Sequence, residues 1–371
     1  MESIDQTAED RRFMAAALRL SRRNAGLTST NPSVGTLIVR ASEAGPLVVG
    51  SGVTALGGRP HAEAEALAEA GLLARGATAY VTLEPCAHHG RTPPCAEALV
   101  AAGVARVVGA ASDPDERVAG KGYAMLRRAG LAVTERVLAD EAADQLAGYL
   151  IRSLRKRPEV TLKLALSQNG KIGRRGAGQV AVTGPEARRQ VHLLRARSDA
   201  ILVGIGTALA DDPELTVRLP GLEARSPIRI VLDQRARLSP TSRLATSARA
   251  VPVLVAAAAE ADPVARQALE AQGVRFLATE LFEGRIALPE LLEDLAQRGV
   301  STVLVEGGAE TARGFLEEGL VDRIVLFEGP GTLDEPAVAS PLDRDRSPPG
   351  FALRRDERFG PDRCLEWVRG L

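Results

Sequence analysis

The sequence predicts an α/β protein of two domains, and three observations support this. The chain of 371 residues is long enough for two hydrophobic cores. Short apolar segments typical of strands alternate with helix-like segments through both halves. The basic stretch Arg155-Lys156-Arg157-Pro158 between the halves is typical of a solvated linker. We therefore place a first domain at residues 1–155 and a second at residues 156–371.

The first domain begins with a helix whose apolar side carries Phe13, Ala17 and Leu18. After a turn at Asn31-Pro32, we expect a hairpin of strands at 36–39 and 47–50, helices at 61–70, 95–102, 120–128 and 141–154, and strands at 79–83, 104–110 and near 133. This alternation predicts one sheet with helices on both faces, a three-layer αβα domain.

Composition excludes several classes of protein. Lys and Arg together number 47, as do Asp and Glu, so no net field points toward nucleic acid or a membrane surface. No apolar run reaches the roughly 18 residues that a membrane span needs, and no secretory signal is visible at the N-terminus. Three cysteines are too few for a disulfide framework. We expect a cytoplasmic protein.

Residues 60–95 hold the densest group of reactive side chains. His61, Glu63, Cys86 and Cys95 lie here, in a chain with only four His and three Cys. One imidazole and two thiolates form a zinc site with an open fourth position, which is the arrangement of a catalytic zinc site. Glu63 suits a general acid or base beside such an ion. Ordinary buried cysteines and a histidine at a helix start would explain each residue alone, but not all four in this order.

The same residues partly match the zinc deaminase signature, His-x-Glu followed by Pro-Cys-x-x-Cys. Here eight residues instead of two separate Cys86 from Cys95. Prolines at Pro60 and Pro93-Pro94 stand where helices would begin. Two helix N-termini would then direct their positive dipole ends at one place and favour thiolate over thiol.

The motifs of this half are similar to those of a known family. Asn31-Pro-Ser-Val-Gly35, His61-Ala-Glu63 and the run from Thr82 to Cys95 resemble the bifunctional riboflavin-biosynthesis deaminase–reductases, in which the eight-residue cysteine spacing is usual. The resemblance implies a cytidine-deaminase-like domain with zinc ligands His61, Cys86 and Cys95 and with Glu63 as the catalytic proton shuttle. It also implies that Asn31, His88 and Arg91 contact the substrate.

The second half repeats the alternation of strands and helices. Strands are expected at 160–166, 200–203, 228–232, 251–255, 302–305 and 323–327, and helices at 185–195, 263–272, 288–297 and 311–318. This order predicts a mostly parallel sheet with crossover helices. Val305-Glu306-Gly307-Gly308 ends a strand and leads into a helix, and bare backbone at such a place suits a phosphate. An ordinary strand-to-helix turn is the open alternative.

The resemblance covers this half as well. Leu162-Lys163-Leu164-Ala165, the run from Thr183 to Arg188, the runs from Gly206 to Pro213 and from Leu215 to Arg218, and Val305-Glu306-Gly307-Gly308 are similar to the family's reductase domain, which is dihydrofolate-reductase-like and uses NADPH. It implies that Arg195, Leu215, Arg218 and Glu306 hold the substrate. The residues implied at the cofactor are Ala165, Thr207, Asp211, Gly308, Ala309, Glu310, Thr311, Ala312, Arg313 and Gly314. Arg195 and Arg218 suit a ribose phosphate because guanidinium groups bind phosphate in a bidentate manner.

Three segments depart from the family pattern. Asn169 replaces the usual Asp before Gly-Lys, Gln179-Val180-Ala181 stands where Ser and Trp are common, and residues 328–350 lack the usual strand-end Pro with a Leu-Gly turn. The first two bear on the cofactor site, and the third bears on the C-terminal loop and a dimer edge.

The predicted function is two steps of riboflavin biosynthesis. Zinc and Glu63 would deaminate a 2,5-diamino-6-ribosylamino-pyrimidinone 5'-phosphate hydrolytically, and NADPH would then reduce the ribosyl group to ribityl. The expected partner is this small phosphorylated molecule, with no nucleic acid and no membrane, in a homo-oligomer (dimer or tetramer). Three alternatives stay open: a nucleic-acid base deaminase, a non-enzymatic zinc module, and a zinc deaminase with an inactive reductase-like domain. An aromatic content of only 3% speaks against the first.

Overall fold

The computed structural model describes residues 4–89, 93–176, 178–343 and 346–370. The chain forms two compact units, residues 1–156 (unit 1) and residues 157–371 (unit 2). The predicted boundary lies after residue 155, within the same basic stretch.

Unit 1 is built on a five-stranded sheet with the order β2-β1-β3-β4-β5. The hairpin β1 (Gly35–Arg40) and β2 (Leu47–Val53) is antiparallel, and β1 also pairs antiparallel with β3 (Thr78–Leu83). The strands β4 (Arg106–Ala111) and β5 (Ala132–Thr134) continue the sheet parallel to β3. The carboxyl ends of β3 and β4 therefore meet at one edge.

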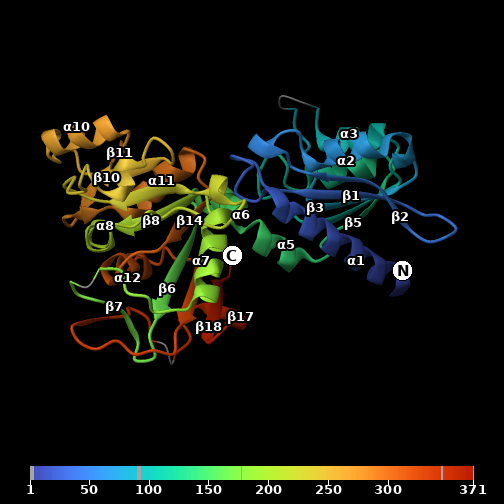
Figure 1. The fold of residues 1–371 in the computed structure, drawn as a ribbon. Helices are drawn as coiled ribbons and strands as arrows, with labels where there is room; N and C mark the ends of the chain where they lie inside the picture. The colour runs from blue at the N-terminus through green and yellow to red at the C-terminus, as the bar shows by residue number, and fades with distance from the viewer. Residues whose placement is uncertain (1–3, 90–92, 177, 344–345, 371) are drawn as a thin grey trace. The chain divides into compact units, whose positions relative to one another are not determined.

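Helices cover both faces of this sheet, as predicted (Figure 1). One layer holds α2 (Ala62–Ala70) and α3 (Cys95–Ala101), with α4 (Lys121–Arg128) packed beside α3. The opposite layer holds α1 (Ile4–Ser21) and α5 (Ala139–Gln145), and α6 (Ala147–Arg155) closes the unit.

Two glycines of β2 let α2 lie unusually close to the sheet. A Cβ atom at Gly52 would come within 2.1 Å of the Ala62 carbonyl oxygen, and one at Gly50 within 2.2 Å of the Ala66 oxygen. Alternate residues of a strand face the same side, so the sequence Gly-Ser-Gly presents both bare positions to the helix. This contact fixes the start of α2, where His61 and Glu63 are found.

Unit 2 contains a nine-stranded sheet with the order β11-β10-β9-β8-β14-β6-β15-β18-β17. Seven strands run parallel: β6 (Glu159–Leu166), β8 (Ala200–Gly204), β9 (Ile228–Leu232), β10 (Val253–Ala257), β11 (Arg275–Ala278), β14 (Thr302–Val305) and β15 (Arg323–Glu328). An antiparallel hairpin, β17 (Phe351–Phe359) and β18 (Asp362–Arg369), completes one edge. The chain reverses its direction across the sheet where β14 returns between β8 and β6, and ligands of open α/β sheets bind at such points.

The connecting helices of unit 2 cover three hydrophobic clusters, and the two largest include residues on opposite faces of the sheet. Ile201 and Val203 belong to one core, and Leu202 between them belongs to the other. The helices are α7 (Pro185–Arg197), α8 (Ile205–Asp211), α9 (Arg243–Thr246), α10 (Pro263–Gln272), α11 (Leu288–Gln297) and α12 (Ala309–Glu317). Two small pairs, β7 (Lys171–Arg174) with β16 (Ala337–Ala339) and β12 (Leu281–Phe282) with β13 (Arg285–Ile286), lie outside the main sheet.

Two sequence predictions about elements were wrong, and several elements of unit 2 were not expected. The expected helix at 141–154 is two helices, because Leu146 leaves the helical conformation with φ −97° and ψ 6°. The last helix begins at Ala309 and not at Thr311. The hairpin β17–β18 was not expected, because residues 354–358 of β17 are all charged and the strand has no apolar face to reveal it.

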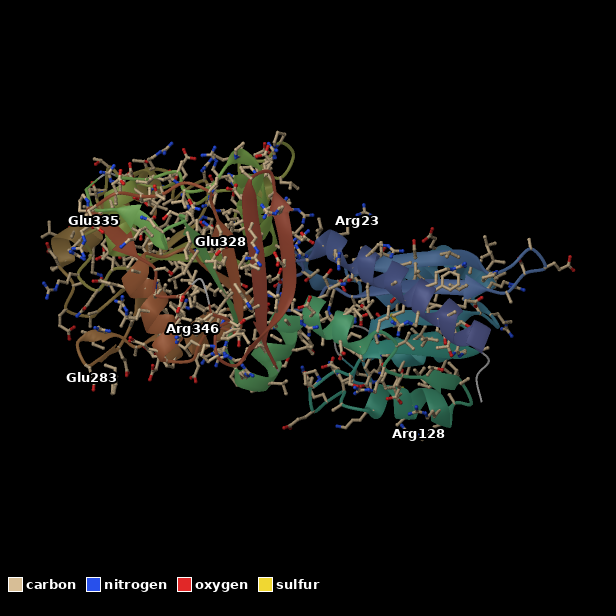
Figure 2. All side chains as sticks on the ribbon, turned by 90° about the horizontal axis from the view of Figure 1, so that it is seen from below. Arg23, Arg128, Glu283, Glu328, Glu335 and Arg346 are labelled. Atoms are coloured by element: carbon tan, nitrogen blue, oxygen red, sulfur yellow. The ribbon has the colours of Figure 1, made fainter. Side chains whose placement is uncertain are left out.

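Charged side chains of both signs are interspersed over each unit (Figure 2). Arg23 and Arg128 belong to unit 1, whereas Glu283, Glu328, Glu335 and Arg346 belong to unit 2. Across the described residues, no helix combines the length and apolar character needed to cross a membrane.

Candidate active sites

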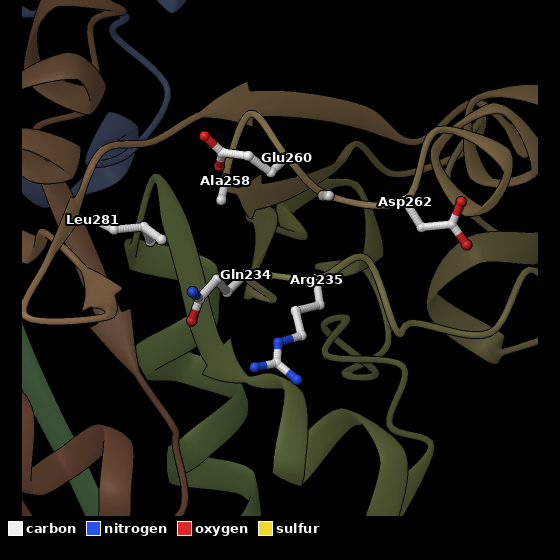
Figure 3. A pocket seen from close by; sticks show the side chains of 7 residues that line it. Gln234, Arg235, Ala258, Glu260, Asp262 and Leu281 are labelled. Carbon is white, nitrogen blue, oxygen red and sulfur yellow. The ribbon is translucent and has the colours of Figure 1, made fainter.

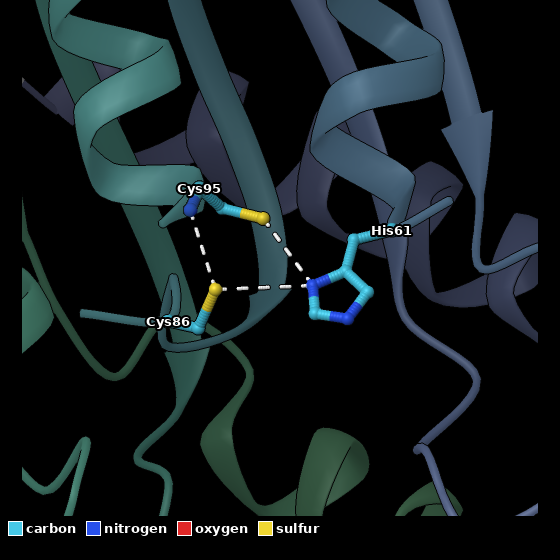
Figure 4. A group of neighbouring side chains, drawn as sticks. All are labelled: His61, Cys86 and Cys95. Atoms are coloured by element: carbon cyan, nitrogen blue, oxygen red, sulfur yellow. Dashed lines mark hydrogen bonds between the residues drawn. The ribbon is translucent and has the colours of Figure 1, made fainter. Parts of the chain in front are cut away.

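The first candidate site is the cluster of His61, Cys86 and Cys95 in unit 1 (Figure 4). The Nδ1 atom of His61 lies 3.8 Å from the Cys86 Sγ and 3.3 Å from the Cys95 Sγ. All three donor atoms lie within 4.8 Å of one another. Bond lengths of about 2.3 Å to sulfur and 2.1 Å to nitrogen in a tetrahedral site place neighbouring donors about 3.5 to 3.8 Å apart. The residues therefore fit a zinc ion that keeps one position open.

Three separate elements bring these donors together. His61 is the N-cap of α2, with extended backbone angles that turn its side chain out of the helix. Cys86 follows β3 at the carboxyl edge of the sheet, and Cys95 is the first residue of α3. The Cys95 backbone N–H donates to the Cys86 Sγ at 3.2 Å, so the start of α3 supplies a donor to the sulfur.

Hydrogen bonding sets the protonation of the two sulfurs. Bonds from Cys95 and His61 lower the pKa of the Cys86 thiol to about 4. The bond to Cys86, together with burial, raises the pKa of Cys95 above its ordinary value. The bond to Cys86 also raises the pKa of His61. The lowered pKa of Cys86 favours its thiolate, which is the form that ligates a metal.

Glu63 lies one residue inside α2 and is 4% exposed. Burial, and then the negative charge at Cys86, raise the pKa of its carboxyl to about 7. A carboxyl group that is half-protonated near neutral pH can both take up and release a proton, which is the property of a general acid and base.

Supporting residues that sequence reasoning missed hold the loops around this cluster. The buried Glu84 carboxylate accepts hydrogen bonds from the N–H groups of Gly120 and Gly122, at 3.1 and 3.0 Å. Tyr149 donates its hydroxyl to the buried Asp113 at 2.9 Å. Glu84 stands directly before Pro85-Cys86 in the sequence. This position next to a predicted zinc ligand was the signal that could have identified it.

The residues predicted to contact the substrate of unit 1 have different surroundings. The Asn31 Nδ2 donates to the Gly58 carbonyl at 2.8 Å, so this side chain ties down the turn that precedes Pro60 and His61. His88 is half-buried, and among the described residues its buried Nδ1 has no hydrogen-bond partner. Arg91 lies outside the described residues. The substrate roles of these three residues stay predictions.

The second candidate site is a buried group of charges at the carboxyl edge of the unit 2 sheet. Glu306, directly after β14, accepts two hydrogen bonds from Arg195 of α7, from Nε at 2.7 Å and from Nη2 at 3.0 Å. Lys163 of β6 lies 3.8 Å from the same carboxylate. Although burial raises it, these two cations lower the pKa of Glu306 to about 2. The sheet brings together Arg195 and Glu306, two residues that the resemblance implied at the substrate, and adds Lys163, which was not among the predicted site residues.

The prediction that Arg195 binds a phosphate does not agree with this geometry. Its Nε and Nη2 donate to Glu306, and its Nη1 donates to the Thr216 carbonyl at 3.1 Å. Both forks of the guanidinium are thus engaged within the protein. Arg218 has a side chain that is 52% exposed and an ion pair with Glu214 at 2.9 Å, which leaves it the more accessible cation. Leu215 is buried, with a positive φ of 57°.

The residues predicted at the cofactor surround the ends of β8 and β14. The Gly308 N–H donates to the Thr207 Oγ1 at 3.0 Å. A Cβ atom at Gly204 would lie 2.4 Å from the Thr311 Oγ1, and one at Gly307 would lie 2.6 Å from its Cβ. Only bare backbone fits here. Gly308 is the N-cap of α12 and offers no side-chain cap, so the first N–H groups of the helix suit a phosphate group, and the cofactor contact of this segment stays a prediction.

Other residues predicted at the cofactor have buried or half-buried side chains, which are less accessible to a bound cofactor. The segment from Gly308 to Gly314 is not a turn but the start of α12, and Ala312 packs fully into the hydrophobic core. Asp211 ends α8, and burial raises the pKa of its carboxyl. Ala165 is a half-buried residue of β6.

One departure from the family pattern has a clear structural role. Asn169 donates its Nδ2 to the Leu333 carbonyl at 2.9 Å, and its Oδ1 accepts the Leu333 N–H at 3.1 Å and the Ser167 hydroxyl at 2.7 Å. Asn supplies both the donor and the acceptor that Leu333 requires, which a carboxylate cannot do. The substitution therefore anchors the loop around Leu333.

Comparison with known proteins identifies both units. Residues 158–364 match the model of the RibD C-terminal domain, and residues 7–111 match that of the cytidine and deoxycytidylate deaminase zinc-binding region. The chain is 38% identical to the riboflavin biosynthesis protein RibD of Escherichia coli, over 97% of this chain and 99% of that protein.

The chain belongs to the RibD family.

Solved structures of RibD proteins match residues of both units. The Acinetobacter baumannii RibD (form 1) has a TM-score of 0.84 with 36% identity and covers 98% of this chain and 100% of that one. A deaminase/reductase of Thermotoga maritima has a TM-score of 0.83 with 29% identity and covers 98% of this chain and 99% of that one. The fold class predicted from the sequence is confirmed. RibD membership also gives the cofactors, zinc in the deaminase domain and NADPH in the reductase domain.

A hollow of about 480 Å³ lies at the carboxyl ends of β9 and β10 (Figure 3). Gln234 and Arg235 line it after β9, and Glu260 and Asp262 line it after β10. None of the site residues predicted above lines this hollow. Its lining carries two acidic side chains, Glu260 and Asp262, and one basic side chain, Arg235. We assign it no part in either reaction.

Proposed function

We propose that this chain catalyses both reactions named for the Thermotoga relative: deamination of diaminohydroxyphosphoribosylaminopyrimidine and reduction of 5-amino-6-(5-phosphoribosylamino)uracil. The observation that carries the proposal is the presence of two buried sites of different chemistry in one chain. One is the His61, Cys86 and Cys95 cluster with Glu63 beside it, and the other is the Arg195–Glu306 pair next to a bare helix start.

In the deaminase domain, His61, Cys86 and Cys95 would hold zinc. When bound there, zinc acts as a Lewis acid and lowers the pKa of a water molecule to about 7. Glu63 would take up a proton from the attacking water and release a proton to the departing amino group. A carbon–oxygen bond forms at the ring carbon, the carbon–nitrogen bond breaks, and ammonia leaves, so one water is consumed for each amino group released.

In the reductase domain, the start of α12 and Thr207 would hold NADPH, which supplies a hydride. The hydride would go to the sugar carbon that is bonded to the ring amine, the bond from this carbon to the sugar-ring oxygen would break, and that oxygen would take up a proton to give the ribityl group. Arg218 would bind the 5'-phosphate, since its guanidinium is accessible. Arg195 and Lys163 hold Glu306 charged and fixed against the substrate.

The homo-oligomer and the cytoplasmic location stay predictions of the sequence. Three cysteines, none of them in a disulfide, support a reducing compartment.

The test is to incubate the purified chain with the diamino substrate, with and without NADPH, and to identify the products by mass. Without NADPH we expect the deaminated product alone, and with NADPH the deaminated and reduced product. An unchanged substrate in both samples would refute the proposal, and a deaminated product that NADPH leaves unchanged would favour an inactive reductase domain.

A further inference from the structure

The segment from Glu214 to Arg218 has no regular secondary structure, yet its backbone is held on several sides by side chains. The fully buried Arg229 donates to the Glu214 carbonyl at 3.1 Å, and Arg195 donates to the Thr216 carbonyl at 3.1 Å. The Val217 N–H donates to the Ser226 hydroxyl at 3.0 Å. These hydrogen bonds hold the backbone of the segment in place and so support the side chains that it carries.

A further contact of this segment involves His192 of α7. The Arg218 N–H donates to the His192 Nδ1 at 3.3 Å. An imidazole nitrogen accepts a hydrogen bond only when it carries no proton, so this contact requires neutral His192 with its proton on Nε2. His192 stands three residues before Arg195 on the same helix face, and it thereby joins Arg218 to the helix that holds Glu306.

Charges around His192 favour the neutral ring. Burial, then the cations Arg195 and Arg218, lower its pKa below the ordinary value, whereas Glu306 and the Thr216 carbonyl oppose this effect less strongly. The short turn η4 (Glu223–Arg225), which packs against α7, carries one acid and one base. The strand β18 also packs against α7, and its Asp362 accepts the Gly184 N–H at the far end of the helix.

We propose that neutral His192 is a positioning residue of the reductase domain, which holds the backbone of Arg218 so that its guanidinium meets the 5'-phosphate, and that acid releases this hold. The proposal rests on the proposed function of Arg218. His192 is the single histidine of residues 157–371, so no other imidazole of unit 2 can produce the same effect.

The test compares wild type with His192→Asn and His192→Phe, from mildly acidic to mildly alkaline pH. Asn keeps a short-chain oxygen that can accept the Arg218 N–H at every pH, whereas Phe keeps the ring shape without an acceptor. The dissociation constant of 5-amino-6-(5-phosphoribosylamino)uracil is measured by calorimetry, which needs no hydride transfer. The KM and kcat of NADPH oxidation are measured in parallel, and ammonia release from the diamino substrate reports on the integrity of unit 1.

In alkaline solution we expect wild type and His192→Asn to bind alike and His192→Phe to bind about five- to tenfold more weakly, the worth of one hydrogen bond. On acidification the wild type should approach the value of His192→Phe, with kcat little changed. The substrate phosphate also titrates near pH 6, but it does so equally in all three proteins. The difference between wild type and His192→Asn therefore isolates His192.

Three results would overturn the proposal. Parallel pH profiles of wild type and His192→Asn would show that protonation of His192 has no effect. Binding that strengthens in acid in the wild type alone would mean that His192 contacts the phosphate as a cation. Equal binding by His192→Phe and wild type in alkaline solution would show that the hydrogen bond does not position Arg218. By contrast, tight binding with no NADPH oxidation in the wild type would refute the proposed reduction and leave this proposal intact.

Discussion

Glu63 of unit 1 is buried and the Glu306 side chain of unit 2 is only 9% exposed, yet their surroundings shift the pKa of the two carboxyl groups in opposite directions. Glu63 has a thiolate beside it, and burial with that like charge raises its pKa to about 7. Glu306 has Arg195 and Lys163 beside it, and these cations outweigh burial and lower its pKa to about 2. The neighbours, and not burial itself, decide whether a buried carboxylate transfers protons or holds charges.

This comparison assigns different chemical roles to the buried carboxyl groups of the two units. Unit 1 needs a group that changes its protonation during each turnover, because hydrolysis of an amine moves protons from water to nitrogen. Unit 2 needs a fixed anion that keeps its shape and charge, because NADPH supplies the hydride and the protein has to orient the reactants. The predictions below test this division, beginning with the largest effect.

Cys86→Ser should remove the metal site. A hydroxyl is a poor zinc ligand and cannot supply the thiolate present at Cys86, so we expect less than one tenth of the wild-type zinc and no measurable ammonia release. Zinc is measured by elemental analysis of purified protein. The matched control is Cys364→Ser, which changes the buried cysteine of unit 2 and should keep both zinc and deamination. Full zinc retention in Cys86→Ser would contradict the assignment of the ligands.

Glu63→Gln keeps the size of the side chain but removes its ability to transfer a proton. We expect zinc to stay bound while deamination falls by at least about a hundredfold, the usual scale for a lost general acid or base. The rate of NADPH oxidation with pre-deaminated substrate should not change. Near-normal deamination would show that another group moves the proton.

Glu306→Gln should destabilise unit 2, because it leaves Arg195 and Lys163 buried without their anion. Loss of one partner of a buried ion pair costs roughly 3 to 5 kcal/mol. In the wild type the pKa of Glu306 is lowered from 4.5 to about 2, so its stabilising effect is present above pH 4.5 and is lost as the pH falls toward 2. The free energies of unfolding of wild type and Glu306→Gln, followed by circular dichroism, should differ at neutral pH and converge near pH 2. A constant difference over that range would refute the ion-pair account.

Arg218→Ala should weaken substrate binding in the reductase domain by about 1.5 to 3 kcal/mol, the worth of a charged hydrogen bond. NADPH affinity, followed by fluorescence, should hardly change. Arg243→Ala is the matched control, because Arg243 is similarly exposed (58% against 52% for Arg218) and pairs with the same Glu214 carboxylate. If both variants weakened substrate binding to the same extent, the cause would be the loss of an ion pair with Glu214 and not the loss of a phosphate contact.

The sequence predicted the zinc site more completely than the reductase site, for a physical reason. His61, Glu63, Cys86 and Cys95 lie in one stretch, and their types and spacing carry the chemistry without knowledge of the fold. Lys163 and Glu306 meet only because β14 inserts beside β6, which depends on the strand order of the whole sheet. Sequence patterns report strands and helices but not such pairings.

The same reason explains the other differences. His192 was not predicted because its partner is the backbone of Arg218, which no residue type reveals. The break at Leu146 lies within a continuous helical pattern, and the strand β17 is too highly charged to be recognised. Arg195 was expected at a phosphate, but burial beside Glu306 engages its guanidinium within the protein.

The central claim is that one chain holds two chemically independent sites, and zinc removal tests it most directly. Protein treated with a chelator is given the pre-deaminated substrate and NADPH, and NADPH oxidation is followed by absorbance while ammonia release from the diamino substrate is measured in a parallel sample. We predict that ammonia release stops and that NADPH oxidation continues at the wild-type rate. Loss of both activities together, with both restored by added zinc, would contradict the account.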